Sequence, residues 1–257
     1  MRLQPAWWIG LCVWIAYNAI IFGTWALVGA DYTNLAGRDA ILERLILPEL
    51  LGAALVLGVV TWLGWWRPVL REQKYGGPQW ALWVLLLFIA PFVAVLLSVT
   101  QWSEIALSHL ATLVVACLLI GINEEILTRG IVLVGLRGST KNEVLVWLGS
   151  TALFGLMHVP NGLFGIGLSG GLVQAVFTFL LGSGLYLLRR ISGTILLPVA
   201  IHALWDFSSF SHQVTSEGTV LLATFFQFLT YLVAMILVVV LFRHDRKSRD
   251  SAEPLAG

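Results

Sequence analysis

Six ionisable side chains stand in three groups inside apolar segments of this chain. The groups are Glu124, Glu125 and Arg129 in the run NEEILTR, His158 at the end of FGLMH, and His202 and Asp206 in HALWD. An ionisable side chain near the centre of a bilayer costs at least about 2.5 kcal/mol, so each group indicates function if its segment crosses a membrane. The three groups are therefore candidate functional residues.

The spacing within each group predicts which side chains pair. Glu125 and Arg129 are four residues apart with the glutamate first, which is the favourable order for an ion pair on one helix. Glu124 then points about 100° away from that pair and faces a different neighbour. His202 and Asp206 are also four residues apart and share one helical face. We therefore expect Glu125 and Arg129 to form a supporting ion pair, and Glu124 to be available for chemistry.

These residue types can hydrolyse an amide without a covalent intermediate. A carboxylate beside a histidine in a low-dielectric cavity acts as a general base that activates water. A second histidine, His202 paired with Asp206, can donate a hydrogen bond to the oxyanion that develops on the attacked carbonyl. The set therefore predicts a hydrolase that uses activated water.

The composition requires the segments that carry these groups to lie in lipid. Hydrophobic residues make up 58% of the 257 residues, charged residues make up 11%, and the mean hydropathy is +0.88. Soluble domains carry about 25% charged residues. The net charge of +1 excludes a nucleic-acid partner, since a surface that binds nucleic acid needs a basic excess.

Eight apolar segments approach the length of about 20 residues that crosses a bilayer. They are residues 7–29, 46–66, 80–100, 105–137, 144–158, 170–188, 194–210 and 219–242. The fourth is too long for one simple crossing, and the fifth is too short. We expect an all-α integral membrane bundle of about eight transmembrane helices.

The three groups are expected at one depth. Glu124 lies 13 residues before Arg137, and His158 lies 14 residues after Val144, so both are about 20 Å from the turn that joins their helices. His202 follows Arg190 by 12 residues, or about 18 Å. Helices that place their polar groups at one level can form a common site.

Lys and Arg residues predict the orientation. They concentrate at the N-terminus, in alternate loops and at the C-terminus: Arg2, Arg67, Arg71, Lys74, Arg137, Lys141, Arg189, Arg190, Arg243, Arg246, Lys247 and Arg249. Because cytoplasmic loops carry the excess of Lys and Arg, both termini are expected in the cytoplasm. We also expect the polar cavity to open towards the cytoplasm.

The predicted regions are a three-span N-terminal region (1–103), a catalytic four-helix core (104–210), a last span (211–243) and a cytoplasmic tail (244–257).

The patterns EExxxR, FxxxH and HxxxD on successive helices of an eight-span protein resemble the CAAX prenyl endopeptidase and bacteriocin-processing family, the CPBP intramembrane glutamic endopeptidases. The resemblance covers roughly residues 104–210. It implies that Glu124 and His158 activate water, that His202 and Asp206 form an oxyanion hole, and that no cofactor takes part. Asp206 stands where the eukaryotic prenyl proteases typically have Asn, and an aspartate donates a hydrogen bond only when protonated. Asp206 therefore either donates a hydrogen bond in its protonated form or orients His202. We favour the orienting role here.

The resemblance also implies the substrate and location. An endopeptidase of this kind cleaves a membrane-associated or prenylated CAAX-type peptide near its C-terminus, or processes bacteriocin or signal peptides. Its partners are a peptide or protein substrate and the lipid bilayer, and a bacterial cell membrane is the expected location. No residue pattern in the chain selects a farnesyl group.

Three other functions stay open. Two histidines and a glutamate can form a zinc site with an open position, although the helical motif HExxH is absent. The run GLSG around Ser169 fits a rhomboid-type serine protease but leaves Glu124 and Glu125 unexplained. Carboxylates and histidines within spans also mark proton relays, so the non-enzymatic alternative is a bacteriocin-immunity or proton-coupled membrane protein.

Overall fold

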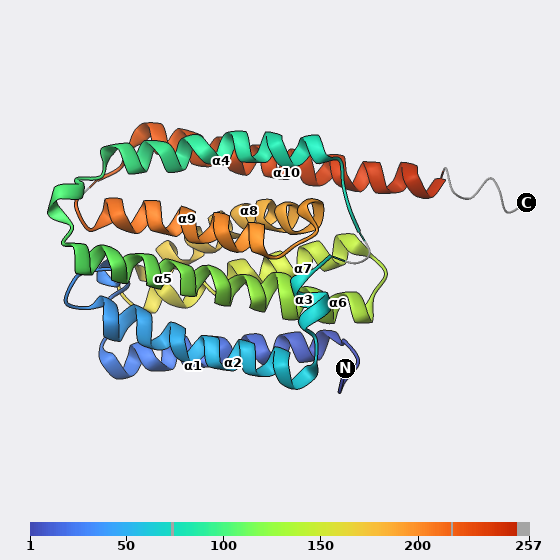
Figure 1. Ribbon diagram of the computed structural model, residues 1–257, viewed down its shortest axis with the longest axis horizontal. Coiled ribbons are helices and arrows are strands. Elements are labelled where there is room, and N and C mark those ends of the chain that lie inside the picture. The colour runs from blue at the N-terminus through green and yellow to red at the C-terminus, as the bar shows by residue number, and fades with distance from the viewer. Residues whose placement is uncertain (73–74, 217, 251–257) are drawn as a thin grey trace, which may run out of the picture.

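The computed structural model describes residues 1–72, 75–216 and 218–250, and it is a bundle of long helices (Figure 1). Apart from one isolated bridge between Arg71 and Thr194, every regular element in these ranges is helical. The α-helices are α1 (Trp7–Val28), α2 (Leu47–Leu63), α3 (Trp66–Leu70), α4 (Gln79–Val99), α5 (Leu107–Glu125), α6 (Leu133–Ser139), α7 (Glu143–Leu156), α8 (Gly167–Ser192), α9 (Leu196–Gln213) and α10 (Leu221–Asp250). The predicted all-α class is confirmed.

Seven helical segments of the described chain are long and apolar enough to cross a membrane. They are Trp7–Val28, Leu42–Leu63, Gln79–Val99, Leu107–Ser139, Glu143–Leu163, Gly167–Ser192 and Leu221–Ser248. The eighth predicted span, 194–210, is α9, an 18-residue helix that carries two histidines, an aspartate and three serines in its later turns. These polar side chains are tolerated because α9 lies inside the bundle, in contact with α4, α5 and α8.

The two predicted spans of unusual length have simple structural explanations. The long fourth segment is one continuous helix, in which the π-helical stretch η4 (Ile126–Val132) joins α5 to α6. Wide π-helical turns occur frequently at functional sites, and this one begins immediately after Glu125. The short fifth segment is extended by the 3-10 helix η5 (Val159–Leu163). The predicted tail is helical up to Asp250, and its residues 251–257 lie outside the described ranges.

The helices that carry the three motifs lie between two outer layers. In Figure 1, α4 and α10 form one outer layer, α1 and α2 form the other, and α5, α7, α8 and α9 run between them. The motif helices are therefore covered by other helices on two sides. Such an arrangement lets polar side chains face a cavity instead of lipid, as polar groups within a membrane require.

Gly121 allows α9 to approach α5 closely beside the candidate site. A Cβ atom at this position would lie 2.9 Å from the carbonyl oxygen of Val199 and 3.0 Å from the backbone nitrogen of Ala203. The two backbones come this close only because glycine has no side chain. The close approach brings His202, next to Ala203, over the Glu124–Glu125 turn of α5.

Candidate active site

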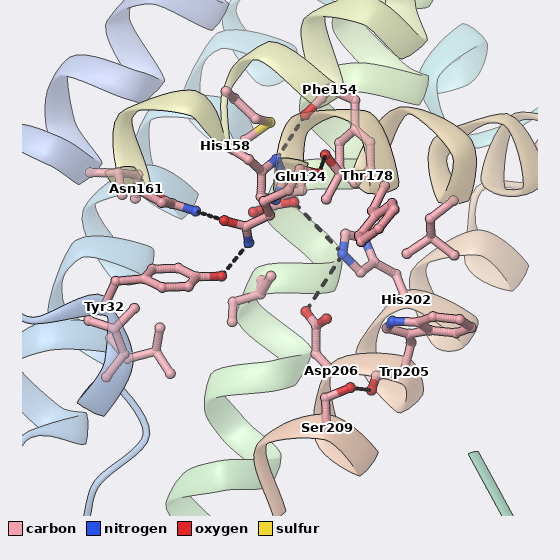
Figure 2. Close-up of a pocket in the computed structure, with 18 of the residues that line it drawn as sticks. Tyr32, Glu124, Phe154, His158, Asn161, Thr178, His202, Trp205, Asp206 and Ser209 are labelled. Atoms are coloured by element: carbon pink, nitrogen blue, oxygen red, sulfur yellow. Dashed lines mark hydrogen bonds and ion pairs between the residues drawn. The ribbon is translucent and has the colours of Figure 1, made fainter. Parts of the chain in front are cut away.

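A cavity of about 270 Å³ lies in the interior of the bundle, and all four predicted catalytic side chains line it (Figure 2). Glu124 comes from the end of α5, His158 from the end of α7, and His202 and Asp206 from the middle of α9. Aromatic rings form much of the remaining wall: Phe22, Trp25, Phe154, Phe177, Trp205, Phe210 and Tyr231. The structure thus brings the three predicted groups to one place.

Glu125 and Arg129 form the predicted ion pair. Arg129 Nη1 lies 2.9 Å from Glu125 Oε1, and both side chains are fully buried. The guanidinium also donates to the Gly182 carbonyl at 3.0 Å and lies over the Phe154 ring at 4.0 Å. A Cβ atom on Gly182 would meet Arg129 Nη2 at 2.7 Å, so glycine makes room for the guanidinium. Three helices are therefore joined through this one cation.

His202 is held by Glu125, a contact that crosses from α9 to α5. Nδ1 of His202 lies 3.0 Å from Glu125 Oε1, the same oxygen that binds Arg129. Because a carboxylate only accepts, Nδ1 donates, and Nε2 is the ring nitrogen that faces the other carboxyl groups. The carboxylate of the supporting ion pair therefore also orients a candidate catalytic histidine.

Two carboxyl groups face Nε2 of His202 (Figure 2). Glu124 Oε2 lies 3.7 Å from this nitrogen, and Asp206 Oδ2 lies 3.6 Å from it. The side chain of Glu124 is 12% exposed and that of Asp206 is 20% exposed, both towards the cavity they line. Among the described residues, Glu124 Oε2 has no hydrogen-bond partner. As the sequence predicts, Glu124 is not committed to the Arg129 pair.

The His158 ring is fixed by its own helix. Its Nδ1 lies 2.9 Å from the Phe154 carbonyl oxygen, one turn earlier. A carbonyl oxygen accepts, so Nδ1 carries the hydrogen and Nε2 of the neutral ring is left as a base. The Phe154 ring packs edge-on against both His158 and His202, with centroids 5.3 and 5.6 Å apart. The first residue of the FxxxH motif therefore separates and orients the two imidazoles.

Glu49 adds a further buried carboxyl group to the cavity wall, and its place there was not predicted from the sequence. Glu49 lies in the first turn of α2 and is 5% exposed. Its Oε2 accepts hydrogen bonds from Tyr17 Oη at 3.0 Å and from Asn123 Nδ2 at 2.8 Å. Asn123 directly precedes Glu124, so this network ties the general-base candidate to α1 and α2. An acidic residue inside the apolar segment 46–66 is the same kind of signal that drew attention to Glu124.

A second polar chain, also missed, spans the cavity wall away from the motifs. Asn161 Nδ2 donates to Gln174 Oε1 at 2.9 Å, and Gln174 Nε2 donates to the Tyr32 hydroxyl (Figure 2). Tyr32 lies in the loop between α1 and α2, and burial raises its pKa to about 12, so it is a neutral phenol at physiological pH. These residues join three separate elements, and no local pattern in the sequence marks them.

The arrangement bears on two of the alternative mechanisms. Ser169 is exposed at the start of α8 and is not among the residues that line the cavity, so the rhomboid-type reading has no site here. In the described part of the chain, no three His, Cys, Asp or Glu side chains are grouped so that they could hold a metal ion.

The cavity extends to one side of the motif residues. It reaches from the motif residues towards the loop after α1 and the turn after α7, where Tyr32 and Asn161 line it.

Comparison with known proteins identifies one family. Residues 106–208 match the model of the family described as type II CAAX prenyl endopeptidase Rce1-like. The matched range contains all three motifs, so the resemblance to CAAX-type membrane proteases is confirmed. Neither a curated protein nor a solved structure matches the chain.

Proposed function

We propose that this protein, whose residues 106–208 belong to the Rce1-like family of CAAX-type proteases, is a glutamic endopeptidase that cleaves peptides within the membrane by means of activated water. One observation carries the proposal. The Glu124 carboxylate faces an internal cavity beside His202, and its Oε2 has no hydrogen-bond partner among the described residues. Burying a carboxylate oxygen without a hydrogen-bond partner costs free energy, so its presence in a membrane-embedded cavity indicates a function.

The first step is attack by water. Glu124, with Nε2 of His158 on the same cavity wall, takes a proton from a water molecule as its oxygen attacks the scissile carbonyl carbon. A C–O bond forms, and the carbonyl oxygen becomes an oxyanion. The proton on Glu124 then passes to the amide nitrogen, the C–N bond breaks, and the products are a carboxylic acid and an amine.

The second requirement is stabilisation of the oxyanion. Nδ1 of His202 is occupied by Glu125, so the ring donates from Nε2 when it is an imidazolium. The Glu125 carboxylate at 3.0 Å and the Glu124 carboxylate at 3.7 Å compensate its positive charge. Since Glu125 already orients the ring, Asp206 is free to act as a second donor in its protonated form. This contact pattern reverses the preference we drew from the i,i+4 spacing alone.

The substrates proposed are peptide segments that reach the interior of the bundle. The aromatic wall favours apolar side chains next to the scissile bond, and a prenylated CAAX-type peptide, a bacteriocin precursor and a signal peptide all satisfy this requirement. A bacterial cell membrane is the proposed location. The wall shows no feature that selects a prenyl group over apolar side chains.

A peptide-cleavage assay on the purified protein tests the proposal. Wild type and Glu124→Gln are incubated in detergent or liposomes with matched prenylated and unprenylated membrane peptides, and the fragments are identified by mass spectrometry. Glu104→Gln, at an exposed glutamate outside the site, serves as the matched control. We expect cleavage by wild type and Glu104→Gln, and less than a hundredth of the wild-type rate from Glu124→Gln.

The same assay separates the enzymatic function from its alternative. More than a tenth of the wild-type rate in Glu124→Gln removes this residue from the general-base role. A bacteriocin-immunity or proton-coupled protein instead cleaves nothing, while Glu124→Gln still abolishes its protective phenotype in cells.

A further inference from the structure

The wall of the active-site cavity has to satisfy the backbone of any peptide that enters it. A peptide carbonyl that leaves water for an apolar site costs free energy unless it accepts a hydrogen bond there. Much of the wall is aromatic, and the hydroxyl groups of Tyr17, Thr178 and Ser209 donate to the Glu49 carboxyl group or to carbonyls of their own helices. A donor in the wall that is not committed in this way is therefore a candidate group for binding the substrate backbone.

Tyr32 carries such a donor. Asn161 Nδ2 donates to Gln174 Oε1 at 2.9 Å, and Gln174 Nε2 donates in turn to the Tyr32 hydroxyl oxygen (Figure 2). Both links of this chain donate in the direction of Tyr32. A phenol can accept and donate at the same time. In the described part of the chain the Tyr32 oxygen only accepts, so its own hydrogen is left for a ligand.

The position of Tyr32 is fixed by contacts that do not involve its hydroxyl group. Its backbone N–H donates to the Phe164 carbonyl at 2.6 Å, and its ring lies against Trp25 with the ring centroids 6.0 Å apart. Asp31 caps the single helical turn that begins at Tyr32 by accepting a backbone N–H hydrogen bond at 2.9 Å. Removal of the hydroxyl group alone therefore leaves the loop and the ring in place.

The hydroxyl group lies in the same cavity as the reactive groups. In Figure 2, Tyr32 lies across the cavity from His202 and Asp206. Burial raises the pKa of Tyr32 to about 12, and the charges of Asp206 and Glu124 act in the same direction, so the phenol keeps its hydrogen at physiological pH. Because both proposed oxyanion donors belong to α9, a donor on the facing wall contacts a different carbonyl of the peptide.

A second phenol in the wall is less accessible. Tyr231 of α10 also accepts a hydrogen bond from a glutamine, Gln227, at 2.8 Å. Its side chain is 4% exposed, and its ring packs against Phe177 and Trp205. Tyr32 is only partly buried and lines the cavity. Tyr32 is therefore the phenol that a ligand in the cavity reaches more easily.

We propose that the Tyr32 hydroxyl group binds the substrate by donating a hydrogen bond to a backbone carbonyl of the peptide other than the scissile one, and that Gln174 and Asn161 are positioning residues that aim it. This inference rests on the proposed endopeptidase function. A hydrogen bond that is equally strong before and during the reaction lowers KM and leaves kcat unchanged. The role of Tyr32 is thus distinct from those of Glu124 and His202.

Equilibrium binding tests this contact without any cleavage. A fluorescein-labelled farnesylated CAAX-type peptide is titrated with the Glu124→Gln protein in detergent, and binding is followed by fluorescence anisotropy. The same titration is repeated after Tyr32→Phe is added. Tyr75→Phe is the matched control, because this ring lies beneath Arg137 and Arg190 and is not among the residues that line the cavity.

We expect Tyr32→Phe to raise the Kd about three- to tenfold, as the loss of one hydrogen bond does, and Tyr75→Phe to change it less than about 1.5-fold. An unchanged Kd in Tyr32→Phe, or an equal rise in both variants, overturns the proposal. Failure of the Glu124→Gln protein to bind the peptide contradicts the substrate contact as well.

Steady-state kinetics with Glu124 intact separate binding from chemistry and from folding. We expect Tyr32→Phe to raise KM about three- to tenfold, with kcat within about twofold of the wild type and the Tm within about 2 °C. A lower kcat with an unchanged KM overturns the proposal, since it places the hydroxyl group in the chemistry. If the Kd changes as expected while the wild type cleaves nothing, the proposed proteolysis fails and the peptide contact stands.

The positioning role of Gln174 has its own test. Gln174→Met removes both hydrogen bonds of the amide and is expected to raise KM with an unchanged kcat. Because it acts through Tyr32, the double variant with Tyr32→Phe is expected to have the KM of Tyr32→Phe alone. Effects on KM that multiply in the double variant contradict this role of Gln174.

Discussion

Replacement of Arg129 by alanine tests whether the buried ion pair holds the site together. The guanidinium is fully buried and binds Glu125, the Gly182 carbonyl and the Phe154 ring. Arg129→Ala leaves the Glu125 carboxylate charged and buried. Among the described residues, His202 is then its only ionisable partner at hydrogen-bond distance. Breaking a buried pair from one side costs about 3–5 kcal/mol. For a chain of this size each kcal/mol lowers the Tm by about 2–4 °C, so we expect a decrease of about 6–20 °C.

Thermal unfolding in detergent, followed by tryptophan fluorescence, measures this effect. Lys141→Ala removes a cation from an exposed position in the turn after α6 and is expected to shift the Tm by less than 2 °C. The double variant Arg129→Ala with Glu125→Leu removes both buried charges and is expected to recover part of the lost stability, since an apolar pair has no uncompensated charge.

A stable but inactive Arg129→Ala protein refutes this reasoning. If its Tm stays within 2 °C of the wild type and peptide cleavage is lost, Arg129 acts in the chemistry and the division of roles between Glu124 and Glu125 is wrong. A Tm decrease that the double variant does not relieve at all also contradicts the charge argument. In that case, lost packing against Phe154 and Gly182 explains the instability.

Three further predictions concern the chemistry. Asp206→Asn is expected to stay within about tenfold of the wild-type rate and to keep its activity at alkaline pH, because an amide donates at every pH. The rate of Asp206→Ala is expected to fall by roughly 10²–10³. Equal losses of rate in the two variants contradict a donor role. Prolonged chelation is expected to leave peptide cleavage intact, and loss of activity that zinc restores contradicts activation of water by side chains alone. Glu49→Gln is expected to lower kcat up to about tenfold with an unchanged KM, because it weakens the hydrogen bond that positions Asn123 beside Glu124. An unchanged kcat in this variant removes Glu49 from a positioning role.

Much of the fold and the core of the site were predictable from the sequence because they depend on local rules. Apolar segments of about 20 residues predict helices that cross a membrane, and the described structure has these helices near the predicted bounds. The pairing of Glu125 with Arg129 follows from the 3.6-residue period of one helix, and so does the separate direction of Glu124. Ionisable groups within apolar runs pointed to Glu124, His158, His202 and Asp206 without any knowledge of packing.

Only the tertiary structure decided how these groups divide their contacts. The spacing on α9 suggested that Asp206 orients His202, yet Nδ1 of the ring is bound by Glu125 of α5. That contact depends on the close approach of two backbones at Gly121, which no periodicity within one helix encodes. The part taken by Glu49 in the cavity wall, through Tyr17 and Asn123, likewise joins three helices that are distant in sequence.

The position of the cavity along the bundle is the clearest case of a property that packing alone decides. Lys and Arg in the loops predict which end of the bundle faces the cytoplasm, and residue counts place the polar groups near mid-depth. Neither quantity says which half of the bundle is filled. Residues 123–135 and 181–191 are all buried and pack the bundle on one side of the catalytic groups. On the other side, aromatic rings line the cavity. How side chains from different helices fill a shared volume depends on their positions in three dimensions, which the order of residues along any one helix does not specify.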